Sequence, residues 1–395
     1  MALRCRWTVV STFAFSSAAL LAGCSDSPPG PSNGGAGMQA TAGSTAGGNT
    51  SAGTGGASGG AGGSASGAGG SSGAGVAGGG ASSGGGGQAG SGGQAGGGAF
   101  AWPDGKTAAV SLTYDDGLDA HLAHAIPLLD SKNIKATFVI ASFPGVDHDW
   151  ALPNAASPLT ARHQAWVAAA AKGHEIAGHT VNHPCVTAVN PGQQAGFRLD
   201  TDYDMARIKG ELDDSLVRIA RLGATTPFTF AYPCYSDLLG VGPSTGKMVT
   251  VLGKQMPQGT VFTGEVDSRF MAARGSTEAI ADPAKVDLHS VPHIVAGPRT
   301  ETDTTPTLAQ LTAVVDMAIA QHGWVVFLMH GVAGDTLPTN CDNGLTYAPE
   351  TCVINYLNTP TATHDGLINY LASKPEVWTT TFKAVAQEIK TKRGL

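Results

Sequence analysis

From about residue 100 onward, short apolar runs alternate with segments whose apolar residues recur every three or four positions. Short apolar, β-branched runs are typical of buried strands, and the longer period is typical of amphipathic helices. Strands that alternate with helices favour a mainly parallel sheet covered by helices, and an open doubly wound sheet and a barrel both satisfy this pattern. The pattern predicts strands at 108–116, 135–142, 174–179, 228–233, 269–275 and 324–331, and helices at 120–132, 161–173, 200–223, 307–323, 364–376 and 382–392.

The first residues of the chain have a different pattern, which is typical of an export signal. Arg4 and Arg6 precede an apolar, small-residue stretch that ends at Cys24 and is short for a membrane span. The run Leu21-Ala22-Gly23-Cys24 resembles a bacterial lipobox, which implies cleavage before Cys24 and its lipidation. An ordinary secretory signal is the alternative, and either signal exports the protein. Because Ser25 follows Cys24, we expect a lipoprotein of the outer membrane or cell surface.

Residues 25–98 are almost entirely Gly, Ala and Ser, and they contain more than half of the 56 glycines of the chain. Such a segment buries too little apolar surface to offset the entropy of ordering, so we predict a disordered tether. The chain is therefore divided into a signal peptide (1–23), a lipidated cysteine with a linker (24–99) and a folded domain (100–395). Beyond the leader, no stretch is apolar and long enough to span a bilayer, so membrane attachment would be by lipid.

The folded domain is acidic, with 21 basic and 29 acidic residues. An acidic surface is a poor partner for nucleic acid or for strongly anionic polymers, whereas neutral or partly cationic polymers suit it. Four cysteines lie in this domain of an exported chain, which predicts two disulfides. Cys341 and Cys352 enclose a turn-rich loop, which leaves Cys185 to pair with Cys234, although the sequence alone permits three connectivities.

Residues that are candidates for a functional site follow four of the predicted strands at the point where each strand ends. Asp115 and Asp116 end the first, His179 ends the third, and Pro233 and His330 end two later strands. In both architectures that the pattern allows, ligands bind at the carboxyl ends of the parallel strands. These residues are therefore expected to meet at one rim of the sheet.

His179 and His183 lie four residues apart and, with a carboxylate from the same rim, form a plausible metal-binding set with open positions. Such a set suits Zn²⁺ and also the non-haem iron of oxygenases. A hydrolytic site needs a second carboxylate as base, which gives both adjacent aspartates a role. Asp116 would then bind the metal, Asp115 would be the base, and His330 could protonate the leaving group. An oxygenase has no evident task for Asp115 or His330.

The motifs TYDDG (113–117), HTVNH (179–183), AYPCY (231–235) and FLMH (327–330) resemble, in order, those of the polysaccharide deacetylase family, carbohydrate esterase family 4. The segment EVWTTTFKAVAQEI (376–389) is similar to the closing segment of many members. The resemblance implies a distorted (β/α) barrel, often of seven strands, that removes acetyl groups from N- or O-acetylated glycans with a divalent metal, most often Zn²⁺. The substrate would be an acetylated polysaccharide or oligosaccharide, and we expect a monomer.

The resemblance also implies roles for individual residues. It makes Asp115 the base, His330 the acid, and Asp116, His179 and His183 the metal ligands. The residue after Pro233, here Cys234, would donate its backbone N–H to the oxyanion, as the amide rather than the side chain does this. For substrate contacts in the glycan groove we propose Tyr235 and Trp150.

The sequence departs from the family at one position. Many members carry an Arg two residues before Pro233 that orients the catalytic Asp, whereas this chain has Ala231. Arg274, from a strand expected nearby, is our candidate replacement. If nothing replaces the Arg, the alternative is a non-catalytic glycan-binding module built on a deacetylase fold. His121, His124, His289 and His293 belong to no motif and are expected at the surface.

Overall fold

The computed structural model describes residues 100–142, 152–241, 246–251, 253–298, 304–333 and 357–395. All of them fall within one unit, Gln88–Leu395. The predicted leader, Cys24 and tether, as well as Trp150, Cys341 and Cys352, lie outside the described residues, so these predictions stay predictions. Within the described ranges, no helix combines the length and apolar character that crossing a membrane requires.

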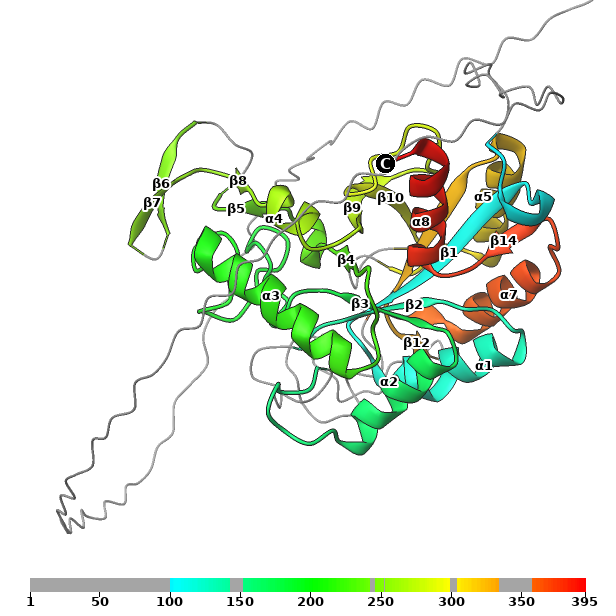
Figure 1. Cartoon of the computed structure of the whole chain (residues 1–395), viewed down its shortest axis with the longest axis horizontal. Coiled ribbons are helices and arrows are strands. Elements are labelled where there is room, and N and C mark those ends of the chain that lie inside the picture. The colour runs from blue at the N-terminus through cyan, green and yellow to red at the C-terminus, as the bar shows by residue number, and fades with distance from the viewer. Residues whose placement is uncertain (1–99, 143–151, 242–245, 252, 299–303, 334–356) are drawn as a thin grey trace, which may run out of the picture. The chain divides into compact units, whose positions relative to one another are not determined.

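Seven parallel strands form a closed barrel, because the first strand pairs with the second on one edge and with the last on the other. The barrel that the family resemblance implied is therefore confirmed, and the open doubly wound sheet is excluded (Figure 1). An eighth strand, β14 (Val377–Thr379), also pairs with β1. The barrel strands are β1 (Ala108–Asp115), β2 (Thr137–Ile140), β3 (Glu175–Gly178), β4 (Thr229–Ala231), β9 (Ala272–Glu278), β10 (Val291–Val295) and β11 (Trp324–Met329).

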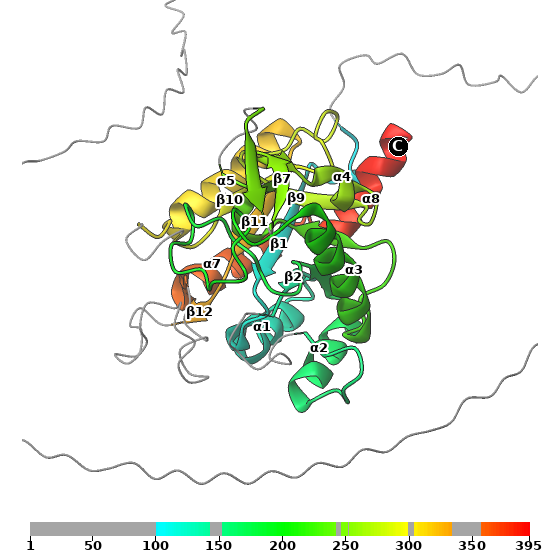
Figure 2. The ribbon, with the colours of Figure 1, turned by 90° about the vertical axis from the view of Figure 1, so that its left-hand side faces the viewer.

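Helices connect the strands and cover the outside of the barrel. Figure 2 shows α5 and α7 on one side of the strands and α3 on the other. Side chains of Thr160, Asp204, Thr307 and Thr381 accept hydrogen bonds from the first turns of α2, α3, α5 and α8, which satisfies backbone donors that a helix start leaves open. The helices are α1 (Ile126–Ser131), α2 (Ala161–Ala171), α3 (Met205–Arg221), α4 (Thr263–Asp267), α5 (Leu308–Gln321), α7 (Thr361–Ala372) and α8 (Phe382–Arg393), with short turns at Pro103–Gly105, His121–Ala125 and Pro233–Tyr235.

The alternation of β1 decides which side chains face the barrel axis. Val110, Leu112 and Tyr114 belong to the core between the strands and the outer helices. The intervening residues turn inward, where Ser111 accepts a hydrogen bond from the Trp324 indole and Thr113 accepts one from Arg274. The last inward residue of β1 is Asp115, so the strand delivers a carboxylate to the upper end of the barrel.

The lower end of the barrel is closed by α8. Phe382, Val385 and Ile389 pack with Trp324 in a second core. The first backbone N–H groups of α8 donate to the side chains of barrel strands: Phe382 N–H to Thr137 at 2.8 Å and Lys383 N–H to Glu175 at 2.8 Å. Because one end is filled in this way, chemistry is confined to the carboxyl ends of the strands.

Several elements differ from the sequence prediction. Strand β10 was missed because Pro292 and His293 interrupt its apolar run, and the three-residue β14 was missed because of its length. The predicted helix 120–132 begins as a π-helical turn at His121–Ala125 before α1. Three short pairings were also not predicted: antiparallel β5 (Leu238–Leu239) with β8 (Thr260–Val261), antiparallel β6 (Met248–Val251) with β7 (Lys254–Pro257), and parallel β12 (Val332–Ala333) with β13 (Thr359–Pro360).

Candidate active site

The adjacent carboxylates at the end of β1 face different partners. Arg274 donates to both oxygens of Asp115, from Nη1 to Oδ1 at 2.8 Å and from Nη2 to Oδ2. Asp116 adopts a left-handed backbone with φ of 77°, and its carboxylate lies toward the two histidines that follow β3. This conformation is costly for a residue with a Cβ and is found where surrounding structure enforces it. One aspartate is thus held by a guanidinium, and the other is directed to imidazoles.

Arg274 supplies the guanidinium that is absent at Ala231. The two residues lie side by side in register, Ala231 on β4 and Arg274 on β9. The guanidinium also donates to Thr113 at 2.6 Å, which fixes its plane against β1. Two parallel N–H donors match a carboxylate in direction as well as charge. Arg274 therefore reaches Asp115 from the strand beside Ala231, at the same level of the barrel.

His179 and His183 present their Nε2 atoms to Asp116. Oδ1 of Asp116 lies 3.6 Å from Nε2 of His179 and 3.4 Å from Nε2 of His183. The two imidazoles meet edge to face, with ring centroids 4.7 Å apart. His179 Nδ1–H donates to the carbonyl of Ala231 at 2.7 Å, which leaves the Nε2 lone pair facing Asp116. The structure thus brings together the three residues that the sequence analysis selected as metal ligands.

This donor set fits a divalent transition metal. The three ligand atoms lie within 4.8 Å of one another. Two ligands of a tetrahedral zinc ion, each about 2.0–2.1 Å from it, are roughly 3.3 Å apart, close to the separations observed here. Oδ1 of Asp116 is buried and accepts no hydrogen bond within the described part of the chain. A buried carboxylate oxygen without a hydrogen-bond donor is energetically costly, and a bound cation would remove that cost.

Burial and neighbouring charges set the protonation of these groups. Burial lowers the pKa of both His179 and His183, so both imidazoles are neutral, as metal ligands must be. Burial and the charge of Asp115 raise the pKa of Asp116 well above its usual range. Burial also acts to raise the pKa of Asp115, but the charge of Arg274 outweighs it and holds that pKa well below the usual range. Asp115 is therefore the ionised carboxylate of the pair before a cation binds.

His330, at the end of β11, completes the rim opposite β3. Its Nε2 lies 3.9 Å from Oδ2 of Asp116, and burial lowers its pKa to about 4. His121 holds the backbone at this position. Its Nε2–H donates to the carbonyl of His330 at 2.7 Å, and its Nδ1 accepts from the N–H of Leu118 at 3.1 Å.

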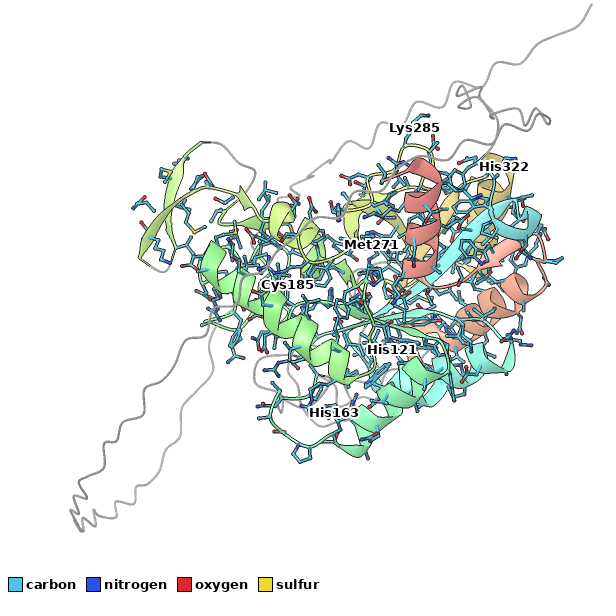
Figure 3. All side chains as sticks on the ribbon, viewed as in Figure 1. His121, His163, Cys185, Met271, Lys285 and His322 are labelled. Atoms are coloured by element: carbon cyan, nitrogen blue, oxygen red, sulfur yellow. A yellow bond between two sulfur atoms is a disulfide. The ribbon has the colours of Figure 1, made fainter. Side chains whose placement is uncertain are left out.

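His121 and His293 were expected at the surface, and both expectations are wrong. Their exposed fractions are 0% and 1%. Figure 3 shows His121 among the side chains of the core. The ring of His293 stacks on Tyr235 with centroids 5.2 Å apart. Sequence reasoning missed both because neither histidine ends a strand, and each is buried by elements distant in sequence.

Glu211, on α3, holds the turn between the two ligand histidines. Its Oε2 accepts the backbone N–H groups of Val181 and Asn182, each at 2.9 Å. Its Oε1 accepts from the Asn182 side chain at 2.6 Å and from the Tyr203 hydroxyl at 2.8 Å. The sequence analysis placed Glu211 on an amphipathic helix but assigned it no role.

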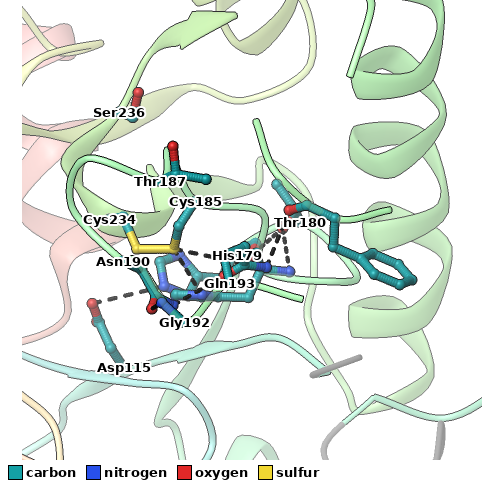
Figure 4. The surroundings of a disulfide bond; sticks show 12 residues. Asp115, His179, Thr180, Cys185, Thr187, Asn190, Gly192, Gln193, Cys234 and Ser236 are labelled. Carbon is teal, nitrogen blue, oxygen red and sulfur yellow. Dashed lines mark hydrogen bonds and ion pairs between the residues drawn. A yellow bond between two sulfur atoms is a disulfide. The ribbon is translucent and has the colours of Figure 1, made fainter. Parts of the chain in front are cut away.

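A disulfide joins Cys185 to Cys234, which is the pairing that the sequence analysis preferred. Figure 4 shows it beside His179 and Asp115, at the same end of the barrel. Cys234 and Tyr235 lie in the turn directly after β4, with φ of 50° and 59°. The structure therefore places Cys234 and Tyr235 on the rim that carries the metal-ligand set.

A second group of histidines lies outside the barrel wall. The Tyr114 hydroxyl is 2.9 Å from Nε2 of His364, whose Nδ1 is 2.8 Å from Asp365. His124 binds the same Asp365 oxygen at 2.8 Å. These groups satisfy one another as a chain of hydrogen bonds, and Tyr114 points away from the barrel axis, whereas Asp115 points toward it.

Comparison with known proteins supports one family. Residues 103–238 match the family model described as polysaccharide deacetylase, and this segment contains Asp115, Asp116, His179, His183 and Cys234. A sequence comparison with curated proteins finds no match.

Several solved structures are similar to the chain at low identity. A candidate polysaccharide deacetylase of Mycobacterium smegmatis has 14% identity and a TM-score of 0.45, covering 75% of this chain and 94% of its own. The Puue allantoinase has 12% identity and a TM-score of 0.45, covering 74% and 94%. The chitin deacetylase of the fungal pathogen Colletotrichum lindemuthianum has 13% identity and a TM-score of 0.38, covering 71% and 87%. The match over residues 103–238 and the closed barrel therefore support the resemblance of this chain to the polysaccharide deacetylase family.

Proposed function

We propose that this protein is a metal-dependent hydrolase that removes acetyl groups from a cell-envelope or extracellular polysaccharide. The match of residues 103–238 to the polysaccharide deacetylase model supports deacetylation of a polysaccharide. The metal dependence is supported by the convergence of Asp116, His179 and His183 around a buried carboxylate oxygen that lacks a hydrogen-bond donor among the described residues. Zn²⁺ is the proposed ion, because two neutral imidazoles and one carboxylate are a usual catalytic zinc set.

Each residue of this rim has a separate role in the proposed reaction. When bound, a divalent cation would polarise the acetyl carbonyl and lower the pKa of a water molecule. Asp115, kept ionised by Arg274, accepts the proton of the attacking water. The N–H of Cys234 donates to the oxyanion that develops on the substrate. Burial keeps the ring of His330 neutral near pH 7, so the proton that Asp115 takes from the water is passed to His330, which delivers it to the departing amine or alcohol.

The observation that carries the catalytic reading is the bidentate contact of Arg274 with Asp115. The alternative of a glycan-binding module was motivated by the missing Arg at Ala231, and Arg274 fills that role from the next strand. A module that only binds glycan has no need to keep a second carboxylate ionised beside the metal ligands. The proposal therefore favours catalysis over binding alone.

The decisive test is acetate release by the full chain, stripped of metal and reloaded with Zn²⁺. N-acetylglucosamine oligomers and acetylated xylan would separate amide from ester substrates. We expect release that depends on added zinc, and no release from either polymer by the zinc-loaded, folded protein would refute the proposed activity.

Asp115→Asn should lower kcat by about 10²- to 10⁴-fold, because the base is lost. Zinc content should stay at the wild-type level, since Asp115 is not a proposed ligand. Glu388→Gln, at a surface ion pair with Lys392, is the matched control and should leave kcat unchanged. A fully active Asp115→Asn would show that another group is the base.

A further inference from the structure

The Cys185–Cys234 disulfide connects two loops that carry different parts of the site. Cys185 lies two residues after His183, on the loop that follows β3, and Cys234 lies in the turn that follows β4. The Cα atoms are 5.5 Å apart across a sequence separation of 49 residues. Figure 4 shows the bond between the two cysteines, with His179 close to it. A single covalent link thus joins the loop that carries the proposed ligand His183 to the proposed oxyanion donor.

Both loops adopt backbone conformations that need support. Thr180 and His183 have φ of 61° and 47°, and Cys234 and Tyr235 have φ of 50° and 59°. The left-handed conformation is unfavourable for a residue with a Cβ, and it persists only where other contacts enforce it. The disulfide supplies such a constraint to both loops at once, because it fixes their separation.

The disulfide also contacts the imidazole of His183 directly. Sγ of Cys185 lies 3.5 Å from Nδ1 of His183. A disulfide sulfur carries no hydrogen, so in this contact the Nδ1–H donates to sulfur, and the Nε2 lone pair is left facing Asp116. The carbonyl of Ala231 does the same for His179. Both ligand histidines are therefore held in one tautomer, one by a carbonyl and the other by sulfur.

We propose that the Cys185–Cys234 disulfide is a positioning element of the active site. It orients His183 toward the metal and holds the Cys234 N–H at a fixed place relative to that ligand. The oxyanion part of this inference rests on the proposed function, whereas the metal part requires only that zinc binds to Asp116, His179 and His183.

The test is the zinc affinity of the full chain carrying Cys185→Ala and Cys234→Ala together. Affinity is measured by competition with a chromogenic zinc chelator, and folding is checked by circular dichroism. We expect the zinc affinity of the double variant to fall about 10- to 100-fold, the range for loss of a group that orients a ligand. Should the alanine pair not fold, the serine pair, Cys185→Ser with Cys234→Ser, serves for the same measurement.

The matched control separates positioning from general stabilisation. Ile389→Ala creates a cavity in the core under the barrel, where Ile389 is fully buried at the opposite end from the rim. It should lower Tm and leave zinc affinity unchanged. If the double cysteine variant also loses Tm but binds zinc with wild-type affinity, the disulfide is only a stabilising cross-link and the proposal is overturned.

A second readout addresses the oxyanion part. At saturating zinc, the double variant should show a lower kcat on the acetylated substrate with KM little changed, because the Cys234 N–H is no longer fixed. An unchanged kcat would refute that part. If the wild-type protein releases no acetate, the proposed function fails, while the zinc comparison still decides whether the disulfide positions His183.

Discussion

At the residue scale, the site depends on a buried ion pair. The side chains of Arg274 and Asp115 are 3% and 4% exposed. If one of the two charges is removed, water cannot solvate the charge that remains. The geometry is bidentate, which a guanidinium supports and an ammonium does not. The orientation of the proposed base therefore depends on the shape of Arg274 as well as on its charge.

Arg274→Lys keeps the charge and removes the bidentate geometry. We expect kcat/KM for deacetylation to fall about 10- to 100-fold, as for other groups that orient a reacting residue, while zinc affinity is retained. Steady-state kinetics at saturating zinc measures the effect. Arg218→Lys, at an ion pair with Asp214 on α3, is the control and should match the wild type. Equal activity of Arg274→Lys and the wild type would show that the charge alone suffices.

The sequence predicted the residues at strand ends more completely than the residues that support them. Asp116 and His179 could be found because each follows an apolar run and the rim is a general consequence of parallel strands, and His183 could be found because it lies four residues after His179. Arg274 was found only because Ala231 departs from a family pattern. His121 could not be found, because its contact with the His330 carbonyl joins segments 209 residues apart and leaves no local pattern.

At the element scale, α3 acts on the site through Glu211. Its carboxylate accepts four hydrogen bonds from the turn 180–183 and from Tyr203, so this helix supports the turn that separates His179 from His183. The sequence predicted α3 correctly as an amphipathic helix, but the buried glutamate interrupts the apolar face rather than extending it. A polar residue on the inner face of a helix was the available signal.

Glu211→Gln should weaken zinc binding about tenfold. The substitution replaces one carboxylate oxygen, which accepts hydrogen bonds, by an NH₂ group, which only donates, and this loosens the turn. Isothermal titration with zinc measures the change. Glu265→Gln, whose side chain pairs with Lys209 and Arg269 at the surface, is the control and should leave zinc affinity unchanged. Wild-type affinity in Glu211→Gln would mean that the turn keeps its shape without the carboxylate.

At the scale of the whole molecule, stability in acid depends on carboxylates that the fold pairs with bases. Asp130 accepts hydrogen bonds from Lys135 at 3.1 Å and Lys172 at 2.9 Å, and lies 3.1 Å from the imidazole of His174. Partial burial acts to raise the pKa of Asp130, but the bonds from Lys172, Lys135 and His174 outweigh it and lower the pKa to about 2. The cluster joins α1 to the segment between α2 and β3.

The lowered pKa fixes the sign of the pH dependence. Asp130 stabilises the folded state fully above its unfolded pKa of about 3.9, and this contribution is lost as pH falls through about 2. Asp130→Asn should therefore lower the free energy of unfolding by roughly 1 kcal/mol at pH 7. This is less than the lowered pKa of Asp130 alone implies, because the carboxyl is partly exposed to solvent. Urea unfolding at pH 7 and at pH 2.5 should show the gap to the wild type narrowing in acid, and a constant gap would contradict this.

The closure of the barrel between β1 and β11 also bears on the order in which the parts of the site form during folding. Asp116, His179 and His183 come from the ends of β1 and β3, which are joined through β2 and lie within 68 residues of one another in sequence. Arg274 and His330 arrive only with the later strands, after loops whose closure is entropically slower. We therefore expect a folding chain to bring the proposed metal ligands together before it adds Arg274 and His330. If the proposed function holds, we expect an incompletely folded chain to bind the ion before it can hydrolyse substrate.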